Sequence, residues 1–406
     1  MVLSKKNVLL CITGGIAAYK MPNLASMLVK KGCNVNVLMT ENACNFITPK
    51  TFEALTSNPC IVDTFEKVYP LAIHHIKLAS EADYVMVSPA SADFLGKMAH
   101  GIADDMITST LLACKCPVAI VPSMNSNMYE NPIVQDNISV LRKYGYIIIE
   151  PSYGYMACKS VGKGKMPEVS ELYLYIEKEL AFEKDMQGLK VLITAGATQE
   201  PIDPVRYITN HSTGKMGYAL AKNAMLRGAD VTLITGHTAL EKPKFVRVIP
   251  VTTAEEMYTA VTEEFQNMDI VVKSAAVADY TPVSVAENKL KKSDKDLCIP
   301  LRRTKDILKS IGEKKKDGQF ICGFSMETEN MLENSVQKMK NKHMDMIVAN
   351  NLKTAGAGFA ADTNVITLIT PNSVEALPIM SKEECAEKIL DKILKIKTDT
   401  VCKISE

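Results

Sequence analysis

The chain has 406 residues, of which 47% are hydrophobic and 23% charged, and 47 Lys and Arg face 46 Asp and Glu. This composition is typical of a globular protein with two or three domains, and the net charge of +1 argues against binding nucleic acid or a membrane surface through bulk charge. No apolar run is long enough to span a membrane. Eleven irregularly spaced cysteines without a secretion signal or a CxxC pair predict reduced thiols in the cytoplasm and no zinc site.

The first half of the chain alternates short apolar runs with amphipathic stretches. Strands are predicted at residues 7–12, 34–39, 84–88, 118–121 and 146–150, and helices at 17–31, 93–100 and 105–112. This alternation predicts a parallel sheet covered by helices on both faces. Residues 151–167 contain three glycines and two prolines and predict a long loop, and a charged helix is predicted at 169–184.

The same pattern starts again after residues 185–188. Further strands are predicted at 190–194, 231–235, 247–251, 270–274, 320–324 and 346–349. We therefore expect an α/β protein with two doubly wound, Rossmann-like domains, 1–186 and 187–406. Ligands of such sheets bind beyond the carboxyl ends of the strands, so the residues that follow each strand are the candidates for function.

The familiar nucleotide motifs are missing. The sequence has no GxxxxGK[ST] segment, which excludes an ordinary P-loop, and no strand leads directly into GxGxxG. Any nucleotide must be held by another arrangement.

Three segments that follow strands in the N-terminal half carry unusual residues. Gly14 and Gly15 would let backbone amides approach an anion at a helix N-terminus, although a plain tight turn explains them equally well. Residues 88–93 are small and leave room for a flat ligand. Residues 122–129 combine two methionines, which pack against flat rings, with two asparagines, which offer donors and acceptors.

Four segments resemble the flavin-dependent cysteine decarboxylases: 39–41 (MTE), 88–93 (SPASAD), 99–105 (AHGIADD) and the specific motif Pro122-x-Met124-Asn125-x-x-Met128-Tyr129. The resemblance implies a flavodoxin-like domain that binds FMN. In this interpretation, His75 would act as the base, Asn125 would bind the substrate carboxylate and Cys158 would be the proton donor. The FMN-binding residues that it implies are Gly14, Gly15, Thr40, Ser88, Ala90, Ser91 and Met124.

The chemistry explains why such residues are needed. A cysteine carboxylate has no electron sink until a flavin oxidises the thiol to a thioaldehyde; CO2 then leaves, and the enethiol receives a hydride and a proton. Taken singly, His75 reads as a surface residue, Cys158 as a stray thiol and Asn125 as a turn residue. Their joint occurrence with the methionine motif favours the catalytic interpretation.

The C-terminal half has a long polar segment, 195–217, after its first predicted strand, and such irregular chain is usually functional. Further candidates are residues 274–280, the lysines at 289–292, and Phe324. Lys338 and Lys342 lie one helical turn apart on one face. Without other information, the lysines would be read as solvated surface and Asp279 equally well as a helix cap.

The segments 200–206 (EPIDPVR), 212–217 (STGKMG), 275–280 (AAVADY) and 348–350 (VAN) resemble the CTP-using phosphopantothenate–cysteine ligases. The resemblance implies an acyl-cytidylate intermediate, Mg²⁺ at Asp279, charge neutralisation by Lys289, and a role for Asn210 in transfer to cysteine. The CTP-binding residues that it implies are Ala275, Asp279, Lys289, Phe324, Lys338 and Lys342. The chain departs from the family pattern at Ala197, Gln199 and Thr213, where Gly or Pro, Arg and Ser are more usual.

Together the two halves resemble the bifunctional enzymes of coenzyme A biosynthesis. The expected activity joins 4′-phosphopantothenate to L-cysteine and then decarboxylates 4′-phosphopantothenoylcysteine to 4′-phosphopantetheine. The family also implies a homo-oligomer, with decarboxylase-domain trimers that bind flavin between subunits, ligase-domain dimers and a combined dodecamer. Two alternatives remain open: a non-catalytic flavin-binding regulatory protein, and a pyridine-nucleotide reductase, against which the missing GxGxxG motif argues.

Overall fold

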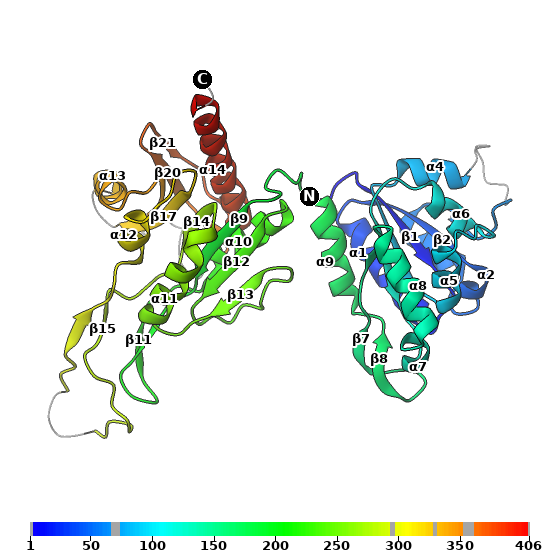
Figure 1. Ribbon diagram of the computed structural model, residues 1–406, viewed down its shortest axis with the longest axis horizontal. Coiled ribbons are helices and arrows are strands. Elements are labelled where there is room, and N and C mark those ends of the chain that lie inside the picture. Colours follow the sequence, from blue (N-terminus) through cyan, green and yellow to red (C-terminus); the bar gives the residue numbers. More distant parts are fainter. Residues whose placement is uncertain (1–2, 66–73, 293–296, 328–330, 352–360, 405–406) are drawn as a thin grey trace. The chain divides into compact units, whose positions relative to one another are not determined.

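The computed structural model describes residues 3–65, 74–292, 297–327, 331–351 and 361–404. The chain forms two compact units, residues 1–182 and 183–406, so the division falls close to the predicted boundary after residue 186 (Figure 1). Among the described residues, no helix is both long and apolar enough to cross a membrane.

Unit 1 is built on a six-stranded parallel sheet in the order β3-β2-β1-β4-β5-β6. The strands are β1 (Asn7–Ile12), β2 (Asn34–Met39), β3 (Cys60–Ile61), β4 (Tyr84–Ala90), β5 (Val118–Pro122) and β6 (Ile147–Ile148). The predicted doubly wound sheet is confirmed. Strands β4 and β5 are buried along their whole length, as continuous apolar runs require when helices cover both faces of a sheet.

The helices of unit 1 lie on both faces of this sheet. Helices α1, α3 and α9 pack together, and α4, α5, α6 and α8 form the other layer (Figure 1). Their bounds are η1 (Ile16–Lys20), α1 (Met21–Lys30), α2 (Glu41–Cys44), α3 (Pro49–Thr56), α4 (His74–Glu81), α5 (Ala92–Ala99), α6 (Met106–Ala113), α7 (Ser126–Tyr129), α8 (Pro132–Lys143) and α9 (Val169–Leu180).

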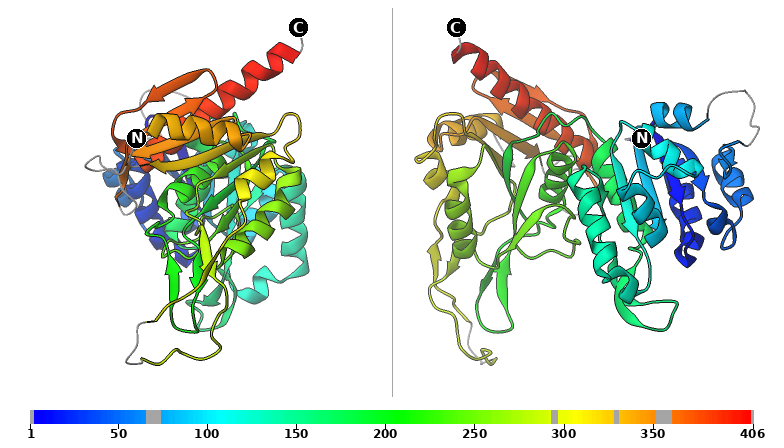
Figure 2. Two further views of the ribbon diagram at one scale, coloured as in Figure 1. Left: turned by 90° about the vertical axis from the view of Figure 1, so that its left-hand side faces the viewer. Right: turned by 45° about the vertical axis from the view of Figure 1, so that its right-hand side comes forward.

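The loop predicted over 151–167 was wrong, because this segment forms an antiparallel hairpin. Strands β7 (Ser152–Tyr155) and β8 (Val161–Lys165) pair and project from unit 1 (Figures 1 and 2). The glycines that suggested a loop serve a close approach of two backbones. A Cβ at Gly164 would lie 2.2 Å from the carbonyl oxygen of Met124, and one at Gly162 would lie 2.8 Å from the Cβ of Ser126.

Unit 2 has an eight-stranded sheet in the order β13-β12-β9-β14-β17-β18-β20-β21. The first six strands are parallel and match the six predicted strands, whereas β20 and β21 continue the sheet antiparallel and were not predicted. The strands are β9 (Lys190–Ala195), β12 (Asp230–Thr235), β13 (Arg247–Pro250), β14 (Ile270–Lys273), β17 (Phe320–Glu327), β18 (Met346–Asn351), β20 (Ile366–Thr370) and β21 (Ser373–Ala376).

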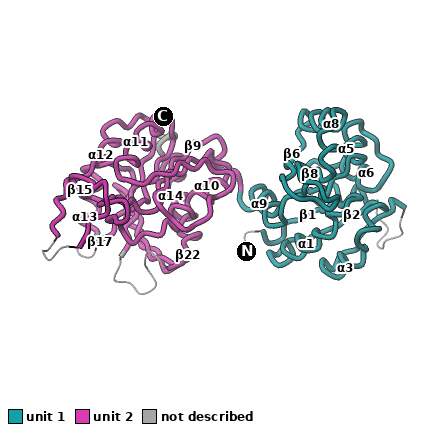
Figure 3. Tube along the Cα trace, turned by 90° about the horizontal axis from the view of Figure 1, so that it is seen from below, with its two compact units in different colours: residues 1–182 teal, residues 183–406 magenta. Residues whose placement is uncertain are grey.

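Helices α10 and α14 pack against each other, and α10 also contacts β9 and β12 (Figure 3). Helices α11 and α12 contact each other, and α13 packs on β17 and β18. The helices are α10 (Lys215–Leu226), α11 (Ala254–Glu264), η2 (Phe265–Asn267), α12 (Ile307–Gly312), α13 (Met331–Asn341) and α14 (Lys382–Ile404).

Three short antiparallel ribbons complete unit 2. They pair β10 (Gln199–Pro201) with β11 (Tyr207–Thr209), β15 (Tyr280–Pro282) with β16 (Leu301–Arg303), and β19 (Thr363–Asn364) with β22 (Met380–Ser381). The first ribbon lies within the long polar segment 195–217, which was predicted to be irregular. The ribbons that carry β11 and β15 project in the same direction from the sheet (Figures 1 and 2).

Candidate active sites

In unit 1, the loops that follow β1 and β4 meet where the strand order reverses. The Thr13 hydroxyl donates to the carbonyl oxygen of Pro89 at 2.8 Å, and the backbone N–H of Ser91 donates to the same hydroxyl at 2.8 Å. Strand order reverses between β1 and β4, which is where ligands of doubly wound sheets bind. The topology therefore favours a ligand site beside Gly14 and Gly15. A Cβ at Gly14 would lie only 2.6 Å from the Cβ of Asn42.

The residues predicted to bind FMN near the carboxyl ends of the strands differ in their local roles and in their burial. Thr40 and Ser91 are helix N-caps, accepting from the backbone N–H groups of Ala43 at 3.2 Å and Phe94 at 3.3 Å. Ser88 and Ala90 are fully buried, backbone included, so neither presents a surface to a ligand within the described part of one chain. The small residues and the N-terminus of α5 fit a flat ligand that carries a phosphate, as a flavin mononucleotide does.

Asn125 and Cys158 are brought into contact, although 33 residues separate them. The Asn125 amide nitrogen donates to the Cys158 sulfur at 3.3 Å, and its oxygen accepts from the backbone N–H of Asn127 at 2.9 Å, capping α7. The hairpin reaches this position because the Met124 backbone N–H donates to the carbonyl oxygen of Gly164 at 3.1 Å. The predicted amide and thiol thus lie in direct contact, as one candidate site.

A second network holds the same hairpin to the body of unit 1. The Glu150 carboxylate accepts from the Tyr129 hydroxyl at 2.6 Å and from the Lys163 ammonium at 2.6 Å, and it also pairs with Arg142. The Lys163 ammonium lies 5.3 Å from the centre of the Tyr129 ring. Because Lys163 belongs to β8 and Tyr129 to α7, these contacts fix the strand that leads away from Cys158.

Within one chain, His75 lies away from Asn125 and Cys158. It is half-buried in the first turn of α4, and Figure 1 shows α4 at the opposite end of unit 1 from α7 and the hairpin.

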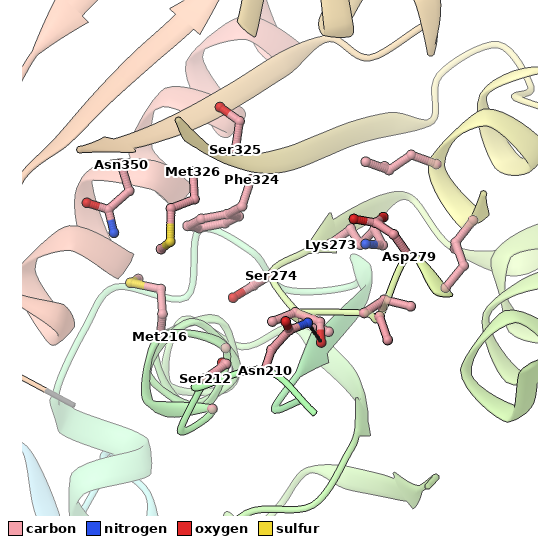
Figure 4. Close-up of a pocket in the computed structure, with 18 of the residues that line it drawn as sticks. Asn210, Ser212, Met216, Lys273, Ser274, Asp279, Phe324, Ser325, Met326 and Asn350 are labelled. Carbon is pink, nitrogen blue, oxygen red and sulfur yellow. Dashed lines mark hydrogen bonds between the residues drawn. The ribbon is translucent and has the colours of Figure 1, made fainter. Parts of the chain in front are cut away.

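In unit 2, a cavity of 780 Å³ opens beside the ends of β14 and β17 and the start of α10 (Figure 4). Of the predicted residues it brings together Asn210, Ala275, Asp279, Phe324, Lys338 and Lys342. Residues that were not predicted also line it, among them Ser212, Met216, Lys273, Met326 and Asn350. Asn350 is buried, and its side-chain oxygen has no hydrogen-bond partner in the described part of the chain.

Buried threonines set the shape of the loop after β14. The Thr194 hydroxyl accepts from the backbone N–H of Ala275 at 3.1 Å, and the Thr198 hydroxyl accepts from that of Ala278 at 3.0 Å. Both threonines are fully buried, so the loop is held from the side of β9. Asp279 follows as an exposed carboxylate at the cavity.

Three lysines converge on the cavity. Lys273, at the end of β14, is half-buried, and burial lowers its pKa to about 8, with repulsion from Lys342 and Lys338 adding to the effect. The Lys342 ammonium lies 2.8 Å from the Asp306 carboxylate. Burial opposes ionisation of Asp306, but the Lys342 contact and the backbone N–H of Lys309 outweigh it and lower the pKa of that carboxyl. Clustered ammonium groups of this kind suit a polyphosphate.

Sequence reasoning missed Lys273. The signal that could have found it is a charged residue at the carboxyl end of an apolar strand, the edge at which ligands bind.

Asn210 lines the cavity from the segment between β11 and α10. Its amide nitrogen donates to the carbonyl oxygen of Ala276 at 3.2 Å. Of the three departures from the family pattern, Thr213 lines the cavity, whereas Ala197 is buried and Gln199 lies in β10, outside the lining.

Lys289 lies outside the residues that line the cavity. It is exposed on the segment between β15 and β16, and its neighbour Leu290 is tied to the loop between β10 and β11. The Leu290 backbone N–H donates to the Asp203 carboxylate at 3.1 Å, and the Arg206 guanidinium donates to the Leu290 carbonyl oxygen at 2.8 Å. The Arg206 hydrogen bonds hold the pKa of Asp203 well below its usual range.

A thiol–amide contact on one α/β unit and a lysine-rich cavity on a second are features expected of an enzyme with two reaction centres. The family described as Flavoprotein matches residues 2–181, and the family described as DNA/pantothenate metabolism flavoprotein C-terminal domain matches residues 186–396.

The coenzyme A biosynthesis bifunctional protein CoaBC of Bacillus subtilis is 48% identical, covering 98% of this chain and 99% of that protein. The CoaBC protein of Vibrio cholerae is 43% identical, covering 96% and 98%. Among solved structures, the C-terminal domain of a CoaBC protein is 42% identical over 53% of this chain and 100% of that chain, with a TM-score of 0.47. The FMN binding protein AtHal3 is 28% identical over 42% and 95%, with a TM-score of 0.39.

The chain belongs to the family of bifunctional coenzyme A biosynthesis proteins. It is an enzyme with a flavoprotein half that fits the decarboxylase role and a C-terminal half that fits the ligase role. This membership favours the predicted function over a regulatory flavoprotein or a pyridine-nucleotide reductase.

Proposed function

We propose that unit 2 joins 4′-phosphopantothenate to L-cysteine at the expense of CTP, and that unit 1 decarboxylates the resulting 4′-phosphopantothenoylcysteine with FMN. The contact between Asn125 and Cys158 at the carboxyl edge of the first sheet is the main support. The lysine-lined cavity supports the nucleotide-dependent step.

In unit 1, Gly14, Gly15 and the N-terminus of α5 would hold the FMN phosphate, with Met124 against the ring. The flavin supplies reversible oxidation of the substrate thiol, which creates the electron sink for loss of CO2. The Asn125 amide has two hydrogens; one is given to Cys158, and the other is left for the substrate carboxylate. Cys158 then donates a proton to the carbon that has lost CO2.

In unit 2, Lys273, Lys338 and Lys342 would neutralise the CTP phosphates, and the exposed Asp279 carboxylate would hold Mg²⁺. Phe324 packs on the nucleotide. Attack of the substrate carboxylate on the α-phosphate gives an acyl-cytidylate and pyrophosphate, and Asn210 presents the acyl group to the cysteine amine.

We further propose that the sites are completed by subunit assembly. A trimer of unit 1 with FMN between subunits would let His75 of one chain serve the Asn125–Cys158 pair of another. A dimer of unit 2 would let Lys289 of one chain reach the cavity of the second. Combining both symmetries gives a closed dodecamer, and we expect this assembly to work in the cytoplasm.

Incubation of the FMN-loaded full chain with 4′-phosphopantothenate, L-cysteine, CTP and Mg²⁺ tests the function. We expect one pyrophosphate and one CO2 for each 4′-phosphopantetheine formed, and no ligation after Mg²⁺ is chelated. Equal ligation with ATP would overturn the choice of nucleotide. Ligation without CO2 release, in protein that shows the flavin absorption band, would overturn the assignment of unit 1.

A further inference from the structure

Cys158 lies at the tip of the β7–β8 hairpin in a closed turn. Tyr155 and Val161 are the last paired residues of the two strands. The Met156 backbone N–H donates to the carbonyl oxygen of Ser160 at 2.9 Å, and that of Lys159 donates to the carbonyl oxygen of Met156 at 2.9 Å. Lys159 has a φ of 63°, the left-handed conformation that lets the chain reverse over so few residues. The turn thereby brings residues 158 and 160 to the same side.

The Cys158 sulfur has two side-chain partners, one within this turn and one at the N-cap of α7. The Ser160 hydroxyl oxygen lies 3.1 Å away and the Asn125 amide nitrogen 3.3 Å away. Because the Asn125 oxygen already accepts from the Asn127 backbone, its NH2 group must face the sulfur. The sulfur therefore accepts from Asn125. The serine hydroxyl, which has one hydrogen and two lone pairs, can either accept from the thiol or donate to the thiolate.

We propose that Ser160 is a positioning residue for the decarboxylase reaction, whose hydroxyl accepts from the resting Cys158 thiol and turns to donate to the thiolate once the proton has left. This inference rests on the proposed role of Cys158 as proton donor. In that step the S–H bond breaks, its electron pair stays on sulfur, and a C–H bond forms at the carbon that lost CO2. The hydride that completes the product comes from the reduced flavin and adds to the carbon bearing sulfur.

The acid–base surroundings of Cys158 agree with this role. The Ser160 hydroxyl, the Asn125 amide and the Ser160 backbone N–H, in that order, lower the pKa of the thiol against a small opposing effect of burial. Of the charged groups on the neighbouring segments, Lys163 pairs with Glu150 and Lys165 with Glu168, while Lys159 and Glu130 are exposed to solvent. Hydrogen bonds, rather than a nearby cation, thus set the acidity of this thiol.

The test compares Ser160→Ala with Ser160→Thr, which keeps the hydroxyl, and with Ser152→Ala, the same change elsewhere in the hairpin. Iodoacetamide labelling of Cys158 is followed against pH in the FMN-loaded full chain by peptide mass spectrometry, with exposed Cys298 as the internal reference. We expect the labelling midpoint of Ser160→Ala to move to higher pH, with about threefold slower labelling at neutral pH. Ser160→Thr should restore the wild-type profile, and Ser152→Ala should leave it unchanged.

Single turnover of 4′-phosphopantothenoylcysteine gives the second measurement. Ser160→Ala should release CO2 at the wild-type rate and form 4′-phosphopantetheine more slowly. If Ser160→Ala showed the wild-type labelling profile and formed 4′-phosphopantetheine at the wild-type rate, the role of Ser160 would be overturned. The proposed function would still stand in that case if Cys158→Ser failed to complete the reaction. Full turnover by Cys158→Ser would instead overturn the proposed function itself.

Discussion

Lys273 gives the cavity of unit 2, the proposed CTP site, a charge that titrates within the pH range of ordinary assays. With a pKa of about 8, about a tenth of this side chain is neutral at pH 7, half at pH 8 and nine-tenths at pH 9. A bound triphosphate would favour the ammonium and return the pKa toward its ordinary value of 10.5. Each CTP bound at pH 8 should then bring about half a proton with it.

The sign of the pH dependence follows from the same shift. Because binding raises the pKa of Lys273, the full affinity is present below pH 8 and is lost as the pH rises above it. The Kd for CTP should therefore rise about tenfold between pH 7 and pH 9. Isothermal titration calorimetry of the full chain with CTP and Mg²⁺, in buffers of different ionisation enthalpy, measures both the Kd and the proton uptake.

The matched variants are Lys273→Met, which keeps the length of the side chain, and Lys309→Met, which removes an exposed lysine of α12 that does not line the cavity. Lys273→Met should bind CTP about tenfold more weakly at pH 7, and its Kd should stay constant up to pH 9. The proton uptake that the wild type owes to Lys273 should be missing. Lys309→Met should behave as the wild type. If the wild-type protein binds CTP equally at pH 7 and pH 9 without taking up protons, Lys273 does not face the phosphates and the reasoning fails.

Other predictions concern the separate halves and the subunit contacts. Fragments 1–182 and 183–406 should each fold, the first binding FMN and the second ligating; a colourless first fragment after reconstitution would contradict the division. His75→Asn should lower CO2 release about a hundredfold or more, whereas Cys158→Ser should release CO2 and lower formation of 4′-phosphopantetheine by a similar factor. Chains of the two variants that are mixed and reassembled should recover part of the 4′-phosphopantetheine formation. A mixture as inactive as its parents would place His75 and Cys158 in the same chain's site. Asn210→Asp should release pyrophosphate once per site but transfer to cysteine about a hundredfold more slowly, because a carboxylate beside a phosphoanhydride is repelled; mass spectrometry of quenched reactions would detect the acyl-cytidylate, and loss of pyrophosphate release would reject this role.

The buried strands could be predicted closely from the sequence. The bounds of β1 and β2 match the prediction to the residue. After Asn7, β1 is an unbroken apolar run, as expected of a strand covered on both faces, whereas β2 begins with Asn34 and Asn36 alternating with valines and ends in an apolar run. The β7–β8 hairpin could not be found this way, since its strands pack through glycine backbone rather than through apolar side chains. The residues near Gly164 in the sequence do not indicate that its backbone lies against that of Met124.

Some residues of the candidate sites could likewise be predicted from the sequence, and others could not. Asn125 and Cys158 were found because each lies in a distinctive segment, and the fold then brought them together. Lys273 was missed because a lysine at the end of a strand is ordinary until the fold brings it to the same cavity as Lys338. The positions of His75 and Lys289 follow from the fold of one chain, whereas their partners under the proposal belong to another, which no pattern along a single sequence specifies.

The two edge strands of the first sheet, β3 and β6, contain only two residues each. An edge this short presents few free backbone groups to an additional strand, which is one way in which natural sheets avoid unwanted pairing. This matters here because the chain goes on to make six more parallel strands in the same relative order. At about 5–20 residues per second, translation gives unit 1 roughly ten seconds or more before the last of unit 2 emerges. Unit 1 is complete at residue 182, before β9 begins at residue 190, and its two short edge strands offer few backbone groups to the strands made later. Order of synthesis and edge length thus both favour pairing of each strand within its own sheet.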